Sequence, residues 1–326
     1  MKAPGFWYSG NSALGALLSP LGLIYGMATA CRQKSSAAVD VGVPVVCVGN
    51  LVAGGSGKTP VVIDLLQRLA ATGKHPHVIS RGYGGGHHAL PHRVDPAADG
   101  ASAVGDEPLL IAAHAPVWVC VDRTAAAKCA VADGADILVL DDGYQDPSLA
   151  KSLSLVVVDG RYGFGNGFMI PAGPLRETIA AGLGRADALV VMGEDTWGVG
   201  DAARRFGPQG LPVLSARAVP GPEIAGLTEG PLLPFAGIGH PEKFFKTLAE
   251  NGCRLSESRS FADHHAFSAS DLESLQARAA ALNARLVTTE KDIQRIPRDR
   301  RGDIEVLTIT LEWDDEAALE RVLNAH

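Results

Sequence analysis

Short apolar runs alternate with helical patterns through about the first two thirds of the chain. The runs are VPVVCVG (43–49), HPHVIS (75–80), APVWVCV (115–121), ADILVL (135–140), LSLVVVD (153–159) and ADALVVM (186–192). Their length and their β-branched residues predict buried strands. Because strands that alternate with helices indicate βαβ units, we expect an α/β fold with a mainly parallel sheet flanked by helices.

A second series of strands and helices follows a stretch rich in proline and glycine, AVPGPEIAGLTEGPLLP (218–234), which is typical of a linker. The series continues through a helix at 270–283 to IEVLTITL (304–311) and predicts a smaller α/β domain. We therefore divide the chain into an N-terminal helix (1–35), a catalytic domain (36–215) and a smaller domain (216–326). This boundary is set only to within tens of residues, and the last strand could return to the first domain.

The N-terminal segment has a pattern of its own. No charged residue lies between Lys2 and Arg32, and the run at 11–31 is long enough to span a bilayer core. On a helix, one face would be apolar (Leu14, Leu17, Leu18, Leu21, Ile24, Tyr25, Ala28) and the opposite face small or polar (Ser12, Gly15, Ser19, Gly22, Gly26, Thr29). This pattern favours a helix in the membrane interface. A helix packed on the protein's own core and a secretory signal are the alternatives.

Composition narrows the class of protein. With 326 residues the chain is long enough for two domains. The formal net charge of −7 gives the chain as a whole no attraction for nucleic acid. Five cysteines without C-x-x-C spacing argue against a disulfide framework and a zinc cluster, and they favour a reducing compartment.

The stretch VGNLVAGGSGKTP (48–60) lies between a predicted strand and a predicted helix, where a phosphate-binding loop is found. Val52 stands where the pattern G-x-x-x-x-G-K-[ST] has its first glycine. The remaining residues can curl backbone N–H groups around phosphate and add an ammonium and a hydroxyl for Mg²⁺. They are Gly54, Gly55, Ser56, Gly57, Lys58 and Thr59. The alternative is a glycine-rich turn without a ligand.

Carboxylates at the ends of two predicted elements are candidates for the chemistry. In LDDGYQ, Asp141 and Asp142 end an apolar strand, which is the arrangement of a Walker B carboxylate. In VGDEP, the position of Asp106 before a helix predicts an N-cap, with Glu107 in the first turn. The alternative for the DDG sequence is a turn that only closes the strand.

Three loops carry further candidates. SRGYGGGHH could cover a ligand, with Arg81 on phosphate, and PAGPLRE brings Arg176 near a helix start. FADHHAFS places an aspartate beside His264, where it could tune a proton acceptor. The alternatives are a flexible loop, a surface ion pair and exposed histidines, and a metal site at the two histidines of the first loop is a further one.

These motifs together resemble the tetraacyldisaccharide 4′-kinase family of lipid A biosynthesis. The stretches that carry the resemblance, in order from residue 3 to about residue 292, are APGFWYSG, VGNLVAGGSGKTP, SRGYGG, VGDEP, LDDGYQ, PAGPLRE, FAGIGHPEKFF, ADHHAFS and TTEKD. The modified phosphate loop is normal in that family, so Val52 does not count against it. One departure is DPSLAKSLS after LDDGYQ, where the family commonly has a histidine and a basic run. Cationic contacts at that place are therefore in doubt.

The resemblance implies a P-loop kinase-type sheet and transfer of the γ-phosphate of ATP to the 4′-hydroxyl of a tetraacylated glucosamine disaccharide 1-phosphate, giving lipid IV-A. It implies Mg²⁺ as a cofactor. The partners would be the lipid disaccharide and the membrane surface, with no nucleic acid and no obligate protein partner. The location would be the cytoplasmic face of the bacterial inner membrane, with the protein peripheral or monotopic.

Carried over to matching positions, the resemblance makes Asp106 the catalytic base, paired with His264, and this role replaces the N-cap as our main prediction for Asp106. Lys58 would contact the β- and γ-phosphates and Thr59 would contact Mg²⁺. Glu107 and Asp142 would belong to the metal shell. The residues expected to contact substrate or phosphate are Arg81, Tyr83 and Arg176.

Two other hypotheses remain. The first is a membrane-associated P-loop NTPase switch or metallochaperone, in which hydrolysis drives partner binding. The guanine-recognition pattern [NT]-K-x-D does not match TTEKD, because a lysine directly precedes Asp292. The second is a soluble small-molecule kinase whose first helix is part of the core.

Overall fold

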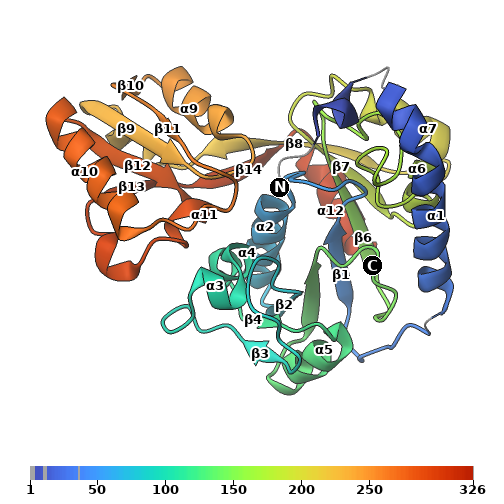
Figure 1. Cartoon of the computed structure of the whole chain (residues 1–326). Coiled ribbons are helices and arrows are strands. Elements are labelled where there is room, and N and C mark those ends of the chain that lie inside the picture. The colour runs from blue at the N-terminus through green and yellow to red at the C-terminus, as the bar shows by residue number, and fades with distance from the viewer. Residues whose placement is uncertain (1–3, 10–12, 36, 326) are drawn as a thin grey trace.

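The computed structural model describes residues 4–9, 13–35 and 37–325, and its strands form two sheets (Figure 1). The strands are β1 Val45–Gly49, β2 Pro76–Ser80, β3 His92–Arg93, β4 Val117–Val119, β5 Ile137–Asp141, β6 Leu153–Asp159, β7 Ala188–Met192, β8 Val213–Pro220, β9 Pro231–Ala236, β10 Arg254–Leu255, β11 Arg259–Ser260, β12 Arg285–Thr289, β13 Ile304–Leu307 and β14 Ile309–Trp313. The helices are α1 Ala13–Ser35, α2 Lys58–Ala71, α3 Ala101–Val104, α4 Asp106–Ile111, α5 Arg123–Ala132, α6 Ile179–Leu183, α7 Val199–Phe206, α8 Ile224–Leu227, α9 Pro241–Glu250, α10 Ala269–Leu282, α11 Glu290–Ile293 and α12 Glu316–Asn324, with 3₁₀ turns η1 Gly5–Tyr8 and η2 Arg298–Arg300.

The large sheet has the strand order β14-β8-β7-β6-β1-β5-β2-β4-β3. All neighbours are parallel except β14 with β8 and β3 with β4. Alternate residues of β1 face opposite sides, so Val46 and Val48 join the core under α2 and α12, while Val45 and Cys47 join the core under α5, α6 and α7. Burial on both faces explains why these strands are continuously apolar in the sequence. The predicted α/β class with a parallel sheet is confirmed.

The small sheet has the order β10-β9-β12-β13, with β11 also paired to β9, and all of these pairs are parallel. Leu272 and Leu275 of α10 and Ile293 of α11 pack on one face of this sheet. Phe244 and Leu248 of α9 pack on the other face. The small sheet therefore has its own two-sided core, separate from the core of the large sheet.

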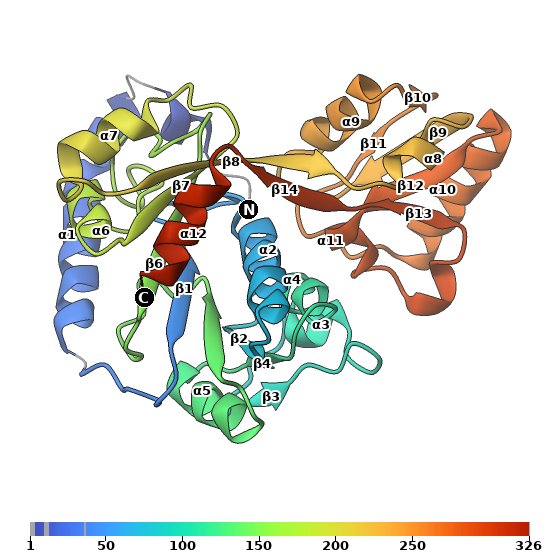
Figure 2. The same cartoon turned by 180° about the vertical axis from the view of Figure 1, so that it is seen from behind.

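The two sheets are joined by two strands that pair with each other (Figures 1 and 2). We expected 304–311 to be one strand, but the run is divided at Thr308: β13 belongs to the small sheet and β14 runs antiparallel to β8 in the large one. The linker predicted at 218–234 is also partly wrong, because β8 continues to Pro220 and β9 begins at Pro231. β14 is the edge strand and β8 lies between it and β7; the proline of β8 is tolerated because Pro220 ends the strand, beyond the residues that pair with β7.

Helix α1 lies along the outside of the large domain with its small residues inward. A Cβ atom added to Gly22 would lie 2.8 Å from the carbonyl oxygen of Met169, so only glycine allows this close approach. The large apolar residues point outward, with Leu17 75% exposed and Met27 61% exposed. A core helix would bury such residues, so the alternative of a helix packed on the protein's own core does not describe α1. Ser12 of the predicted small-residue face and the first three residues of the predicted segment 1–35 lie outside the described residues.

The span Ala13–Gln33 is long and apolar enough to cross a membrane, and only 17% of its most apolar window is buried in the protein. An exposed apolar surface of this extent marks a contact with lipid or with another apolar surface.

Candidate active site

The phosphate-binding loop joins the carboxyl end of β1 to the first turn of α2. Gly54 and Gly57 have φ angles of 121° and 87°, which favour glycine at both positions. Asn50 stabilises the loop, because its Nδ2 donates to Ser56 Oγ at 3.1 Å and to the Gly54 carbonyl at 3.4 Å. Lys58 and Thr59 are the first two residues of α2. The loop and the N-terminus of this 14-residue helix form an anion-binding geometry.

Val52 has a structural role that explains the departure from the common loop pattern. It is buried and forms an isolated antiparallel bridge with Leu175. Backbone bonds on either side extend the pairing, from Ala53 N to the Pro174 carbonyl at 2.8 Å and from Arg176 N to the Leu51 carbonyl at 2.8 Å. The start of the phosphate-binding loop is therefore attached to the PAGPLRE segment, and this attachment brings Arg176 to the site.

Asp142 links the lysine of this loop to Arg176. The Arg176 Nη1 atom donates to Asp142 Oδ1 and Oδ2 at 2.9 and 3.0 Å, and Lys58 Nζ lies 3.6 Å from Oδ1. Burial raises the pKa of Asp142, but the charges of Lys58 and Arg176 outweigh burial and lower it overall. Asp142 also has a φ angle of 52°, a conformation that costs energy in a residue other than glycine. Such strain is common at functional sites.

Asp141, the last residue of β5, is buried beside Asp142. Ser80 Oγ donates to its Oδ2 at 3.2 Å from the end of the neighbouring strand β2. Burial, followed by the negative charges of Glu107 and Asp142, raises the pKa of Asp141 to about 7. A buried carboxyl group whose pKa is raised beside other carboxylates is typical of a functional site.

The carboxylates of Asp141 and Asp142 and the hydroxyl of Thr59 fit Mg²⁺, which prefers oxygen ligands. Within the described part of the chain, no three histidine, cysteine or carboxylate side chains are close enough to hold an ion together. Mg²⁺ in kinases is typically held by one or two carboxylates with water and phosphate oxygens. Asp141, Asp142 and the Thr59 hydroxyl are ligands of this type. A bound cation would also relieve the repulsion that raises the pKa of Asp141.

Asp106 lies at the contact between the two domains. Its Oδ2 accepts from Arg295 Nε at 2.7 Å and also from Nη2 of the same side chain. His264 Nδ1 lies 3.1 Å and Lys291 Nζ 3.9 Å from this oxygen. Burial raises the pKa of Asp106, but the hydrogen bond to His264 and the charges of Lys291 and Arg295 lower it overall. The carboxylate is therefore held ionised by three groups of the small domain.

The prediction that Asp106 is a helix N-cap is wrong. Asp106 is the first residue of α4, and the N-cap is Gly105 with a φ angle of 93°. A Cβ atom at position 105 would lie 2.7 Å from the Tyr83 carbonyl, so the cap position has no room for a side chain. The Oδ1 atom of Asp106 instead accepts from the Glu107 backbone N–H at 3.0 Å.

Sequence reasoning missed two residues at this contact, Lys291 and Arg295. Lys291 Nζ donates to Glu107 Oε1 at 2.9 Å, and Arg295 also binds Asp292 Oδ1 at 2.8 Å. Lys291 belongs to TTEKD, directly after β12, and its place at the carboxyl end of a parallel strand was a usable signal. Arg295 carried no comparable signal, because its partner Asp106 is 189 positions away.

The structure thus brings together two groups of the predicted residues: Lys58, Asp142 and Arg176 at the phosphate loop, and Asp106, Glu107 and His264 at the domain contact. Arg81 and Tyr83 lie on an exposed loop beside them. The Tyr83 ring is 75% exposed, and its centroid is 6.1 Å from that of His264. The loop histidine His88 contacts the Ala103 carbonyl at 2.8 Å, a structural bond.

The chain is similar to known proteins over almost its whole length. The family model described as tetraacyldisaccharide-1-P 4'-kinase (LpxK) matches residues 14–326. The tetraacyldisaccharide 4'-kinase of Rhodospirillum centenum is 51% identical over 99% of this chain and 96% of its own, and that of Paramagnetospirillum magneticum is 49% identical over 98% and 97%. The fold is similar to a crystal structure of LpxK from Aquifex aeolicus in complex with ATP, with a TM-score of 0.76 at 24% identity over 96% of this chain and 99% of that one.

Proposed function

Because the chain belongs to the tetraacyldisaccharide 4′-kinase family, we propose that it transfers the γ-phosphate of ATP to the 4′-hydroxyl of a tetraacyldisaccharide 1-phosphate. The observation that carries the proposal is the pairing of Asp106 with His264: Asp106 begins α4, which packs against α2, the helix that follows the phosphate loop, and His264 comes from the small domain. A phosphate-binding loop alone would fit many nucleotide-binding proteins. The buried carboxylate of Asp106 supplies the acceptor side of a kinase.

The phosphate side of the reaction belongs to the large domain. The backbone of Gly54–Gly57 and the Lys58 ammonium would bind the β- and γ-phosphates, and Arg176, held at Asp142 beside Lys58, would add a further positive charge. Thr59, Asp142 and Glu107 would hold Mg²⁺, with Asp141 as a further candidate. When bound, Mg²⁺ neutralises charge on the phosphate oxygens.

The acceptor side depends on Asp106. Its Oδ2 is occupied by Arg295 and His264, whereas Oδ1 has one backbone partner and a second lone pair for a sugar hydroxyl. A carboxylate with a lowered pKa is a weak base, but phosphoryl transfer depends mainly on positioning and charge stabilisation. Asp106 would therefore orient the hydroxyl and take its proton late, while His264 fixes the orientation of Asp106.

The lipid substrate would account for the exposed apolar face of α1. The exposed face of α1, which includes Leu17, Leu23 and Ile24, would lie in the membrane interface and keep the site close to a substrate whose acyl chains remain in the bilayer. Since ATP is cytoplasmic, the protein would be peripheral or monotopic on the cytoplasmic face of the inner membrane.

The test is direct. Purified protein is incubated with labelled ATP, Mg²⁺ and the disaccharide 1-phosphate lipid, and the lipid product is separated by its charge. We expect a product with one added phosphate at the 4′ position. Steady ATP hydrolysis that does not require the lipid, with no phosphorylated lipid, would overturn the proposal in favour of an NTPase switch.

A further inference from the structure

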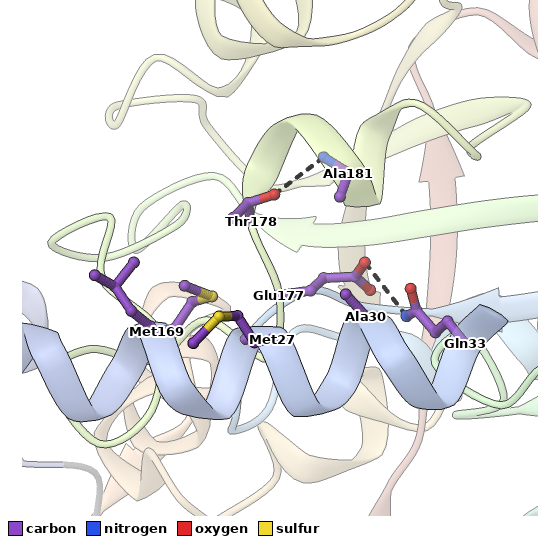
Figure 3. A pocket seen from close by; sticks show the side chains of 9 residues that line it. Met27, Ala30, Gln33, Met169, Glu177, Thr178 and Ala181 are labelled. Carbon is purple, nitrogen blue, oxygen red and sulfur yellow. Dashed lines mark hydrogen bonds between the residues drawn. The ribbon is translucent and has the colours of Figure 1, made fainter. Parts of the chain in front are cut away.

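A buried carboxylate, Glu177, lies between helix α1 and the phosphate-binding loop. It follows Arg176 in the chain and is 4% exposed. It forms part of the wall of a cavity of about 260 Å³ between α1 and α6, whose other walls are mainly apolar, with Leu23, Met27 and Met169 among them (Figure 3). Burying a carboxylate in such surroundings costs free energy unless the carboxylate is paired, so its hydrogen-bond partners indicate its role.

Three donors from different parts of the chain converge on Glu177. Arg185 Nη2 lies 3.0 and 2.8 Å from its two oxygens and compensates its charge. Gln145 Nε2 donates to Oε1 at 3.0 Å. Gln33 Nε2 of α1 donates to Oε2 at 3.4 Å, and Figure 3 shows this second bond. Charge compensation requires only Arg185, so the bonds to Gln145 and Gln33 need another explanation.

The bond to Gln145 fixes the orientation of an amide group. Gln145 Nε2 donates to the Asn50 carbonyl at 2.8 Å as well as to Glu177, so both of its hydrogens are in use. Its oxygen must then face the other way, and Oε1 lies 3.3 Å from Arg176 Nη1. The same Nη1 atom holds both oxygens of Asp142. A continuous set of hydrogen bonds therefore runs from Glu177 through Gln145 and Arg176 to Asp142.

We propose that Glu177 is a positioning residue that fixes the orientation of the Gln145 and Arg176 side chains toward Asp142. Through its contact with Gln33, this orientation also depends on the position of α1 against the large domain. The inference rests on the proposed function, because it takes Asp142 as a carboxylate of the nucleotide site. Helix α1 then has two tasks. It keeps the protein at the lipid surface, and it completes a hydrogen-bond network that ends at the phosphate loop.

The first test compares Glu177→Ala and Glu177→Gln with Thr178→Ala. Thr178 lines the same cavity and caps α6 through Ala181 N, but it lies outside the network. We expect Glu177→Ala to lower kcat and raise the half-saturating Mg²⁺ concentration, each by about tenfold, with the KM for lipid unchanged. Glu177→Gln keeps one acceptor for Gln145 and should recover part of the loss, and Thr178→Ala should match the wild type. Wild-type kcat and Mg²⁺ dependence in Glu177→Ala, or an equal loss in Thr178→Ala, would overturn the proposal.

A double-mutant cycle keeps the test valid if Glu177→Ala folds poorly. Gln145→Ala and Glu177→Gln act on Arg176 through the same bond, so their effects on the half-saturating Mg²⁺ concentration should be less than additive. Full additivity would show that Glu177 acts by another route.

The second test addresses α1. Gln33→Ala removes the contact with Glu177, and Cys31→Ala changes an exposed side chain two residues away. With lipid in vesicles, we expect Gln33→Ala to lower kcat roughly two- to tenfold and Cys31→Ala to have no effect. Equal kcat for Gln33→Ala and the wild type would remove α1 from the proposal.

Binding of a fluorescent ATP analogue, measured against Mg²⁺ without lipid, separates this inference from the proposed function. Weaker Mg²⁺-dependent binding in Glu177→Ala supports the positioning role even if the wild type forms no phosphorylated lipid. Phosphorylated lipid from the wild type, together with unchanged binding in Glu177→Ala, supports the proposed function and overturns the positioning role.

Discussion

In the described part of the chain, side chains of the large and small domains meet at two contacts that differ in burial and chemistry. At the contact of α4 with α11, the side chains of Asp106 and Arg295 are 4% and 5% exposed and form charged hydrogen bonds. At the other contact, the rings of Tyr162 and His240 stack with centroids 5.1 Å apart. Beside them Lys243 lies 2.9 Å from Asp159, with 48% of its side chain exposed.

The difference shows which contact sets the domain arrangement. Separating a buried ion pair exposes two charges that were bound to each other, and leaving one of them unpaired is strongly destabilising. The two partners of an exposed ion pair can bind water instead, so separating them costs little free energy. The small domain therefore supplies the groups that hold Asp106, and the site is complete only where the two domains meet.

The largest expected effect concerns the buried contact itself. Asp106→Ala and His264→Ala should each lower kcat by about 10²- to 10⁴-fold, because the acceptor hydroxyl loses its oriented base. The double variant should lose little more than either single one, since the two residues act as a unit. Steady-state rates with ATP and lipid provide the measurement. Losses that multiply in the double variant would contradict the pairing.

Arg295→Ala should come next. It leaves the buried Asp106 with His264 and Lys291 alone, and the loss of one partner from a buried ion pair costs roughly 3–5 kcal/mol. Urea unfolding followed by tryptophan fluorescence gives the change. Arg217→Ala is the matched control, because Arg217 pairs with Glu312 at the surface and its loss should cost far less. Equal effects of the two substitutions would remove the distinction between the contacts.

Asp141→Asn tests the cost of burying a carboxylate beside the phosphate loop, to which the charge of Glu107 at the domain contact adds. The pKa of Asp141 is raised to about 7, so its protonated form stabilises the fold at low pH, and this stabilisation is lost as the pH rises from about 4 through 7. Asparagine stays neutral. Without Mg²⁺ and nucleotide, the variant should therefore be more stable than the wild type by roughly 1–4 kcal/mol at pH 8 and by less at pH 5. A Tm difference that is the same at both pH values would contradict the raised pKa.

The smallest effect is expected at the exposed contact. Lys243→Ala removes the ion pair with Asp159 and the cation over the Tyr162 ring, and it should cost at most about 1 kcal/mol. The loss should shrink further at 1 M salt, because exposed pairs are screened. A loss as large as that of Arg295→Ala would mean that this contact also fixes the domain arrangement.

Local patterns predicted the parts of the molecule that depend on neighbouring residues. The strand, glycine-rich loop and helix around Lys58 follow each other in the chain, and the apolar run before Asp141 is a buried strand of the parallel sheet. The same reasoning failed where the partner is distant. Nothing near Arg295 indicates that it meets Asp106, and nothing near Val52 indicates that it pairs with Leu175.

Two errors came from patterns that allow more than one structure. An apolar run predicts a strand but does not say which sheet the strand joins, so the return of the last strand to the first domain was left open and the division of 304–311 at Thr308 was not predicted. An aspartate before a helix predicts an N-cap, but the close approach of the Tyr83 carbonyl requires glycine at position 105 and moves Asp106 into the first turn. Packing against distant backbone decided both cases.

The pairing of β8 with β14 has a consequence for the architecture as a whole. Pro220 lies opposite Ile309, so the chain leaves the large sheet and re-enters it at adjacent points. The small domain is thus an insertion between two neighbouring strands. Paired Cα atoms in antiparallel strands are only about 5 Å apart, so a short turn can bridge the ends that excision of residues 221–308 would leave. A single proteolytic cut within the insertion would leave both halves tethered to the sheet.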